Sequence, residues 1–289
     1  MFKKNIITLL RPEQYVKNLF IFAPLFFSFK FNFINISNSL LAFFLFSLVA
    51  SSAYIFNDLM DINDDRNHPV KKFRPLADGK VSLTTAKTLI FLLSGIALAI
   101  SWIVNTNLFF ILFVYLVLNI LYSLKLKHIT ILDISIIATG FVLRIFAGSF
   151  SINEDLSMWI ITMTFLLALF LGLAKRRDDV LLSEEGTKTR RNIDGYNLEF
   201  INAAMVLMSG IIAVAYILFT TSTETINKFN TEYLYVTSFF VILGILRYMQ
   251  ITFVEKNSGD PTYILYKDKF LKITIILWLI SFYLMVKII

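Results

Sequence analysis

Cysteine is absent from the 289-residue chain, and charged residues are scarce. Without cysteine there is no disulfide, no thiolate metal site and no cysteine nucleophile. Only 16% of the residues are charged, against about 25% in an average soluble chain. The chain also lacks a linker rich in proline, glycine or serine and a small-residue cleavage site after Lys3 and Lys4. These absences argue against a soluble appendage and against a removed signal peptide.

Apolar surface is what the chain has in excess. Hydrophobic residues make up 57% of it, and phenylalanine alone supplies 30 residues. The mean hydropathy is +0.72. Water does not solvate that much apolar surface, whereas the hydrocarbon core of a bilayer does. We therefore predict an all-α, polytopic membrane bundle that forms a single integral membrane domain over residues 1–289.

Nine segments have the composition of a spanning helix, which needs about 20 mostly apolar residues. The predicted spans are 18–33, 31–57, two within 89–124 that are separated by a turn at 105–107, 131–150, 156–174, 200–223, 233–254 and 270–286. The first is the weakest of them because Pro24 and Lys30 lie within it.

The loops between these spans divide by charge. Basic residues gather at the N-terminus and in every second loop, while the opposite side holds little more than Lys30, Lys228 and Lys287. Positive loops stay in the cytoplasm, so we predict a cell-membrane protein with its N-terminus inside and its C-terminus outside. This topology accounts for the net charge of +7 without a nucleic-acid partner, and the basic loops are also suited to anionic membrane lipids.

Acidic residues gather at the cytoplasmic end of the second span. Tyr54, Asn57 and Asp61 are spaced to share one face of a helix, and Asp65 follows. Amide and carboxylate oxygens aimed at one point suit Mg²⁺, which leaves further positions for water and substrate phosphates. A solvated helix end is the alternative interpretation. The positive loops that topology demands have no need for acids, however, and this favours a metal site.

A basic loop follows directly. Lys71, Lys72 and Arg74 lie between Pro69 and Pro75, which should break the helix and stiffen the loop. Such side chains neutralise phosphate oxygens, and arginine binds two of them at once. Ordinary positive-inside charge is the alternative. His68 is read as a polar loop residue.

Two arginines lie inside predicted spans, Arg144 in the fifth and Arg247 in the eighth. A charge within a membrane normally faces a cavity or a partner, so each marks either a functional site or a structural pair with a buried acid. A second mixed cluster, Lys175-Arg176-Arg177-Asp178-Asp179, ends the sixth span. Acids and bases on one face of an apolar bundle indicate that the bundle holds a lipid tail while its polar mouth holds diphosphate and Mg²⁺.

These motifs resemble those of the UbiA prenyltransferase superfamily. The run Asn57-Asp58-x-x-Asp61-x-x-x-Asp65, followed by Lys71-x-x-Arg74-Pro75-Leu76, is similar to its first aspartate-rich motif. Three further stretches resemble the branch called decaprenyl-phosphate phosphoribosyltransferase, and they are 11–18, 131–148 and 175–177. The resemblance implies a nine-helix, UbiA-like bundle in which Mg²⁺ helps to transfer 5-phosphoribose from phosphoribosyl diphosphate to a polyprenyl phosphate, with release of diphosphate.

The same resemblance assigns roles to particular residues. The implied Mg²⁺ ligands are Asn57, Asp61 and Asp65. The implied catalytic residues are Asp58, Asp61 and Lys71. The implied substrate-binding residues are Lys17, Tyr54, Lys71, Arg74, Lys127, Arg144, Lys175 and Arg176. Of these, Lys17 and Tyr54 would hold phosphoribosyl diphosphate, Lys71 would lie between the substrates, and Lys127 and Arg144 would hold the lipid phosphate.

Two other functions stay open at the level of sequence. A prenyltransferase acting on an aromatic or quinone-precursor acceptor would share the fold and the first acidic motif, and Asp178 and Asp179 keep it under consideration. A transporter would use Arg144 and Arg247 to line its path, but transporter sites lie near the membrane midplane and these acids lie at one face. The sequence leaves the oligomeric state open, and a homo-oligomer is one alternative. It also leaves open whether the product enters a cell-wall pathway.

Overall fold

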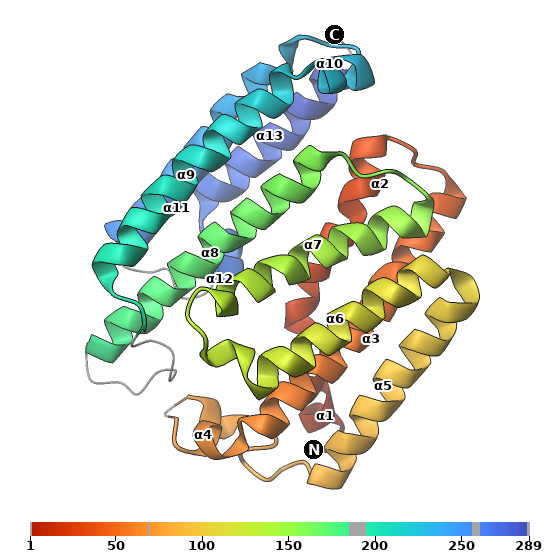
Figure 1. Ribbon diagram of the computed structural model, residues 1–289, viewed down its shortest axis with the longest axis vertical. Helices are drawn as coiled ribbons and strands as arrows, with labels where there is room; N and C mark the ends of the chain where they lie inside the picture. Colours follow the sequence, from red (N-terminus) through yellow and green to blue (C-terminus); the bar gives the residue numbers. More distant parts are fainter. Residues whose placement is uncertain (1, 69, 185–194, 256–260, 288–289) are drawn as a thin grey trace. The chain divides into compact units, whose positions relative to one another are not determined.

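The computed structural model describes residues 2–68, 70–184, 195–255 and 261–287 (Figure 1). Within these ranges every regular element is a helix, which confirms the all-α prediction. The chain divides into two compact units, Met1–Ser157 and Met158–Ile289, and each is described by itself. The proposal of one integral domain over residues 1–289 stays a prediction.

Eight helices in the described ranges are long and apolar enough to cross a membrane. The first unit contributes α3 (Phe33–Met60), α5 (Leu83–Val104), α6 (Thr106–Leu124) and α7 (Leu132–Ile152). The second unit contributes α8 (Met158–Glu184), α9 (Leu198–Thr221), α11 (Ser238–Phe253) with the 3₁₀ helix η5 (Tyr233–Thr237) before it, and α13 (Lys269–Lys287). These coincide with the second to ninth predicted spans.

Shorter helices connect them. In the first unit these are α1 (Phe2–Leu10), η1 (Pro12–Phe22), α2 (Ala23–Ser28), α4 (Ile62–Arg66), η2 (Lys71–Phe73) and η3 (Leu126–His128). In the second unit they are α10 (Thr223–Phe229) and α12 (Pro261–Lys267).

The expected first span, residues 18–33, is the one that differs. It is not a single α-helix but the 3₁₀ helix η1 followed by α2, which ends at Ser28 with Phe29 in the left-handed conformation (φ 54°). Pro24 has no N–H for an α-helical bond at this point. Because a 3₁₀ helix rises about 2.0 Å per residue against 1.5 Å for an α-helix, η1 and α2 together extend about 31 Å, close to the thickness of a hydrocarbon core.

Side-chain caps explain why several helices begin where they do. Asn32 accepts a hydrogen bond from the Asn35 amide at the start of α3, and Ser82 does the same for Thr85 at the start of α5. Asn105 ends α5 and caps α6 by accepting from the Leu108 amide at 3.0 Å. The turn predicted between the two spans within 89–124 is therefore confirmed at this residue.

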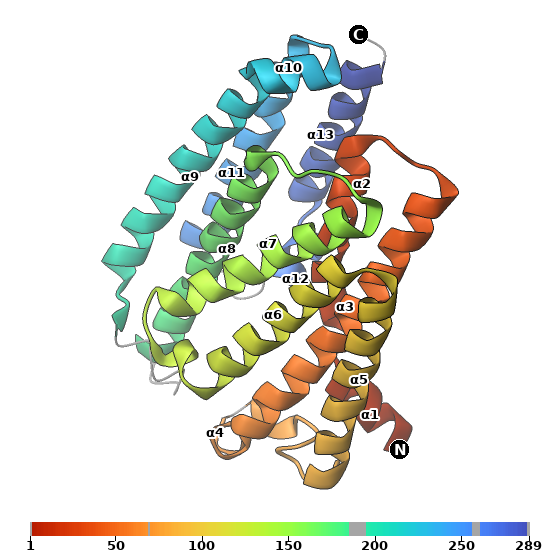
Figure 2. The ribbon, with the colours of Figure 1, turned by 45° about the vertical axis from the view of Figure 1, so that its right-hand side comes forward.

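Helix α3 is the centre of the first unit, where it packs against α5, α6, α7 and η1 (Figures 1 and 2). Its buried face carries many small residues, and packed among them are Ala42, Phe46, Val49, Ala50 and Ala53. Small side chains let membrane helices approach closely. The polar end of α3 therefore projects from a well-packed helix.

In the second unit, α8 packs against α9, and α11 packs against both α9 and α13. A buried polar contact joins three of its elements: the Tyr216 hydroxyl lies 2.8 Å from Thr237 Oγ1 and accepts from Trp278 Nε1 at 2.6 Å.

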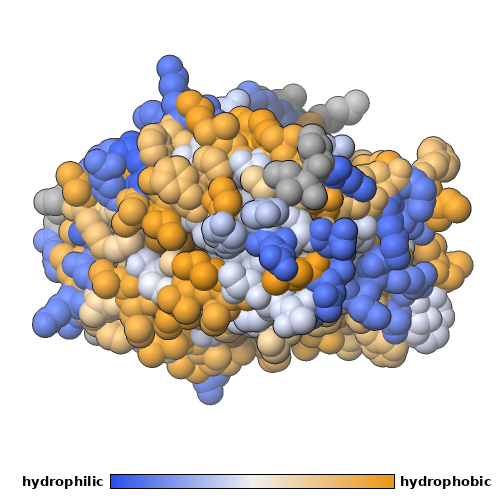
Figure 3. All heavy atoms as spheres, turned by 90° about the horizontal axis from the view of Figure 1, so that it is seen from above, coloured by the Kyte–Doolittle hydropathy of each residue, from blue (hydrophilic) through white to orange (hydrophobic). Residues whose placement is uncertain are grey.

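On the face drawn in Figure 3, apolar side chains cover much of the surface. In both units large apolar residues such as Ile103 and Leu207 are exposed, as expected of helices that face lipid.

Candidate functional site

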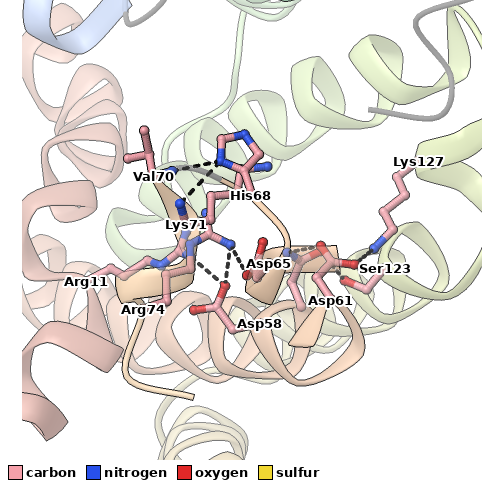
Figure 4. A network of polar contacts seen from close by, with 11 residues as sticks. Arg11, Asp58, Asp61, Asp65, His68, Val70, Lys71, Arg74, Ser123 and Lys127 are labelled. Atoms are coloured by element: carbon pink, nitrogen blue, oxygen red, sulfur yellow. Dashed lines mark hydrogen bonds and ion pairs between the residues drawn. The ribbon is translucent and has the colours of Figure 1, made fainter. Parts of the chain in front are cut away.

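A network of polar side chains surrounds the C-terminal end of α3 (Figure 4). The helix ends at Met60, Asp61 bends the backbone (φ −95°, ψ 5°), and α4 starts at Ile62. The start of η1, the loop around η2 and the turn between α6 and α7 supply the other members. All of these elements belong to the first unit.

One half of the network is built on Asn57 and Asp61. The Asn57 amide donates to Asp61 Oδ2 at 3.1 Å, and Ser123 Oγ donates to Asn57 Oδ1 at 3.2 Å. The ammonium of Lys127 forms an ion pair with Asp61 Oδ1. The structure thus brings together Asn57 and Asp61, which the residue pattern singled out, with Lys127, which only the family resemblance implied. It adds Ser123, which the sequence analysis did not predict.

The other half is built on Asp58 and Asp65. Arg11 donates to Asp58 Oδ1 at 2.5 Å, and Arg74 donates to the same oxygen at 3.0 Å and to Asp65 Oδ2 at 2.7 Å. The Arg11 guanidinium also lies over the ring of Tyr54, 5.6 Å from its centroid. Arg11 was not among the predicted site residues, although it opens the motif at 11–18; its left-handed backbone (φ 54°) is visible only in the structure.

The loop that carries Arg74 is held by local chemistry. Arg74 is extended (φ −62°, ψ 142°), as expected of a residue before proline. His68 Nδ1 accepts hydrogen bonds from the backbone amides of Val70 and Lys71 at 3.2 and 3.3 Å, which gives this histidine a role in the loop. Lys71 is half-buried, and Pro69 lies outside the described residues.

The oxygen atoms around Asp61 determine which metal ion this site could hold. No three histidine, aspartate or glutamate side chains gather as ligands anywhere in the described ranges. The oxygens of the half built on Asn57 and Asp61 are the Asp61 carboxylate, the Asn57 amide and the Ser123 hydroxyl. That set fits Mg²⁺, which takes one or two protein carboxylates and completes its shell with water and phosphate oxygens. The pairing of Asp61 with Lys127 shows that this carboxylate faces positive charge.

Arg144 lies on α7 and is buried. Its guanidinium donates to Asn18 Oδ1 at 2.8 Å, to the Gly140 carbonyl at 2.7 Å and to the Tyr115 hydroxyl at 3.2 Å. The rings of Phe46, Tyr115 and Phe141 surround it at 5.0–5.2 Å. Among the described residues its partners are neutral, so the alternative of a buried acid partner does not apply to Arg144.

Arg247 behaves differently. It donates to Asp268 at 2.7 Å and lies 2.8 Å from Glu255, both in the second unit. Arg247 therefore forms structural ion pairs, although its partners are a half-buried and an exposed acid where the alternative predicted a buried one. An arginine paired in this way gives less support to the transporter alternative.

The remaining predicted residues lie partly outside the network. Lys17 is half-buried on η1, and Tyr54 is half-buried beneath Arg11. Lys175 and Arg176 belong to α8 in the second unit, where Arg176 is buried and paired with Asp179. Arg177 donates to Asn202 and to the Thr252 carbonyl, so it joins α8, α9 and α11.

These features are those of a multi-pass, helical membrane protein with a site of acids and arginines at the end of a central helix. Residues 19–276 match the model of the UbiA prenyltransferase family, and the chain belongs to that family. It is therefore a membrane transferase, as the sequence predicted.

Relatives and solved structures agree with this assignment. The chain is 32% identical to a decaprenyl-phosphate phosphoribosyltransferase of Mycolicibacterium smegmatis, over 95% of this chain and 90% of the relative. It is 27% identical to a protein of the same name from Mycobacterium tuberculosis, over 95% and 92%. A UbiA homologue from Archaeoglobus fulgidus, solved with GPP and Mg²⁺, matches with a TM-score of 0.71 over 98% of this chain and 100% of that one, at 20% identity. This last likeness concerns the fold.

Proposed function

We propose that this transferase moves 5-phosphoribose from phosphoribosyl diphosphate to a polyprenyl phosphate, in a reaction that depends on Mg²⁺ and releases diphosphate. The observation that carries the proposal is the network at the end of α3, where Lys127 pairs with Asp61 beside Asn57, and Arg74 pairs with Asp58 and Asp65. Two anionic substrates and a cation need such a mixture of charges. The names of the relatives that cover nearly the whole chain support the same reaction.

The proposed Mg²⁺ site consists of Asn57 and Asp61, with Ser123 beside them. When bound, the metal neutralises charge on the departing diphosphate. The chemistry of the donor set supports this role, because one carboxylate and two neutral oxygens leave room for phosphate oxygens.

The other proposed roles concern the binding of the two substrates. Lys17, Tyr54 and Arg74 hold the donor, and Lys71 lies between the two substrates. Lys127 and Arg144 hold the lipid phosphate, with Lys175 and Arg176 as further anion-binding residues. A phosphate oxygen of the lipid forms a bond to C1 of the ribose while the bond from C1 to the diphosphate oxygen breaks. Since the lipid phosphate is already ionised, no strong general base is needed.

Catalysis then depends on orientation and on neutralising the charge that develops on the leaving group. Asp58, also proposed as catalytic, acts through the arginines that it holds. We place the site on the cytoplasmic side of the cell membrane, since the basic loops around η2 and η3 are there by the distribution of charge, and since phosphoribosyl diphosphate is soluble.

The test is an assay of purified protein with Mg²⁺, labelled phosphoribosyl diphosphate and a polyprenyl phosphate. We expect a lipid-linked pentose phosphate and free diphosphate, and no product when the metal is removed with EDTA. A parallel reaction with prenyl diphosphate and an aromatic acceptor tests the alternative. Product there, with none from phosphoribosyl diphosphate, would overturn the proposal. Flux into liposomes without product in either reaction would favour a transporter.

A further inference from the structure

The aspartate-rich motif divides into two sets with different partners. We propose that Arg11 joins Arg74 in binding a phosphate group of the donor, and that Asp58 and Asp65 are positioning residues that orient these two arginines. The metal site then consists of Asn57 and Asp61 without Asp65. This inference rests on the proposed function for the identity of the donor, but the anion site itself follows from the contacts below.

The contacts of the four side chains separate the two pairs. Helical spacing alone does not, because at about 100° per residue an unbroken helix would hold all four within an arc of about 100°. The helix ends at Met60, and Asp61 bends the backbone before α4. In the structure the first pair, Asn57 and Asp61, meets Ser123 and Lys127, and the second pair, Asp58 and Asp65, meets Arg11 and Arg74.

The burial of the side chains shows which way the set of Asp58, Asp65, Arg11 and Arg74 faces. The Asp58 and Asp65 side chains are 2% and 4% exposed, whereas those of Arg11 and Arg74 are 21% and 27% exposed. The acids thus lie below and the guanidinium groups above them, towards solvent (Figure 4). Asp58 accepts both guanidinium groups on one oxygen, and Asp65 accepts Arg74 on another. Both buried carboxylates are therefore engaged by arginine, and together they are well placed to hold the two arginines side by side.

The arginines retain most of their donors. A guanidinium has five N–H groups, and each arginine contacts the carboxylates through one terminal nitrogen. Apart from the Tyr54 ring, these are the hydrogen bonds and ion pairs of the two guanidinium groups within the described residues. The remaining N–H groups form a surface that suits phosphate oxygens, for which arginine forks have the right geometry.

The backbone at Arg11 is strained to reach this place. Arg11 adopts φ 54°, ψ 57°, a conformation that a residue with a side chain rarely takes and that is found at functional sites when the surroundings enforce it. A ladder of hydrogen bonds between η1 and α3 does so: Tyr15 meets Ser51 at 2.8 Å, and Asn18 donates to Ser47 at 2.9 Å. These bonds tie η1 along α3 and bring Arg11 to Asp58.

Direct binding measurements distinguish the two sets of residues. Mn²⁺ is the metal probe, and its binding is measured by electron paramagnetic resonance. Inorganic diphosphate is the anion probe, and its binding is measured by calorimetry. We expect Asp65→Asn and Arg11→Gln to bind Mn²⁺ as the native protein does. Both should bind diphosphate more weakly, by about ten- to a hundredfold, the range for losing a charge-assisted hydrogen bond. Asp61→Asn should lose Mn²⁺ binding.

Arg66→Gln is the matched control, because Arg66 lies in the same region but donates to the Ala77 carbonyl; it should leave both affinities unchanged. Arg11→Lys keeps the charge without the fork and should give an intermediate loss, which guards against misfolding of Arg11→Gln. Loss of Mn²⁺ binding in Asp65→Asn, or native diphosphate affinity in both Arg11 variants, would overturn the inference. Neither probe requires turnover, so failure of the phosphoribosyl transfer itself would show separately in the activity assay.

Discussion

At the scale of single residues, Asp61 is the group on which the proposed reaction depends most directly. It lies where α3 ends, accepts the Asn57 amide and pairs with Lys127. Its carboxylate is thus the point at which the metal ligands and the lipid-phosphate residues of the proposal meet.

Asp61→Ala should lower turnover by about a hundredfold or more, as expected when a preorganised electrostatic group is removed. Expression and folding should be unaffected because Asp61 is only half-buried. The measurement is product formation at saturating Mg²⁺. Asp64→Ala, an exposed acid three residues further on, is the control. Near-normal turnover in Asp61→Ala would contradict the metal assignment.

Arg144→Ala should raise the KM for polyprenyl phosphate more than the KM for phosphoribosyl diphosphate, because Arg144 is proposed to hold the lipid phosphate. It should also destabilise the protein by about 1–3 kcal/mol, since Asn18 and Tyr115 lose a buried partner. Steady-state kinetics and thermal unfolding in detergent measure the two effects. Arg247→Gln, which removes a membrane arginine paired with acids, should leave the lipid KM unchanged. A change confined to phosphoribosyl diphosphate would refute this role of Arg144.

At the scale of elements, the 3₁₀ helix η1 lies unusually close to its neighbour α7. A Cβ atom added at Gly148 would lie 1.9 Å from the Ile21 carbonyl oxygen, a backbone atom that cannot turn aside. Glycine at this position is therefore what lets η1 and α7 pack backbone to backbone, and η1 in turn carries Arg11.

Gly148→Ala should destabilise the protein by about 1–3 kcal/mol, the usual effect of overpacking, and weaken donor binding because η1 must shift. Gly210→Ala is its control: a Cβ there meets nothing within 4 Å, and alanine in a helix is favoured over glycine by up to about 1 kcal/mol. Thermal unfolding of both variants in one detergent tests the pair. Equal stability of the two would mean that the contact at Ile21 is not restrictive.

The start of α13 contains a pH-sensitive contact. The hydrogen bond from Arg247 lowers the pKa of Asp268, which also accepts from the Leu271 amide at 2.8 Å. A depressed carboxyl pKa stabilises the folded protein above the unfolded pKa of about 3.9, and this stability is lost as the pH falls through the folded value.

We therefore expect native stability to fall more steeply below about pH 4 than that of Asp268→Asn. The measurement is thermal unfolding of both proteins between neutral and acidic pH. Parallel curves for the two would show that the Arg247–Asp268 contact contributes no pH dependence.

At the scale of the whole molecule, the predicted topology requires that the η1–α2 segment and α3 each cross the membrane. Since the chain has no cysteine, single cysteines are clean probes. Lys30→Cys should react with an impermeant maleimide in intact cells, whereas Lys4→Cys and Lys72→Cys should react only after permeabilisation; all three positions are exposed. Labelling of Lys4→Cys and Lys30→Cys from the same side would show that η1–α2 does not cross.

Features that depend on local composition and spacing could be predicted from the sequence. Long apolar runs indicated eight helices that the structure contains, Asn105 marked a turn through its capping chemistry, and the spacing of Asn57 and Asp61 placed them in contact. The UbiA family was also readable from the motifs. Such features need only the chain's own periodicity, because a helix brings residues four apart together wherever it lies.

Which charges meet depends on how the helices pack. The pairs Arg11–Asp58 and Lys127–Asp61 join residues 47 and 66 positions apart, and no local pattern distinguishes these two bases from the other basic residues of the loops. The same holds for the 3₁₀ form of the first segment, which is held through Asn18 and Gly148 by α3 and α7. Helix packing sets these distances. Packing depends on how side chains from separate helices fit together, and this cannot be read from the order of residues along one helix.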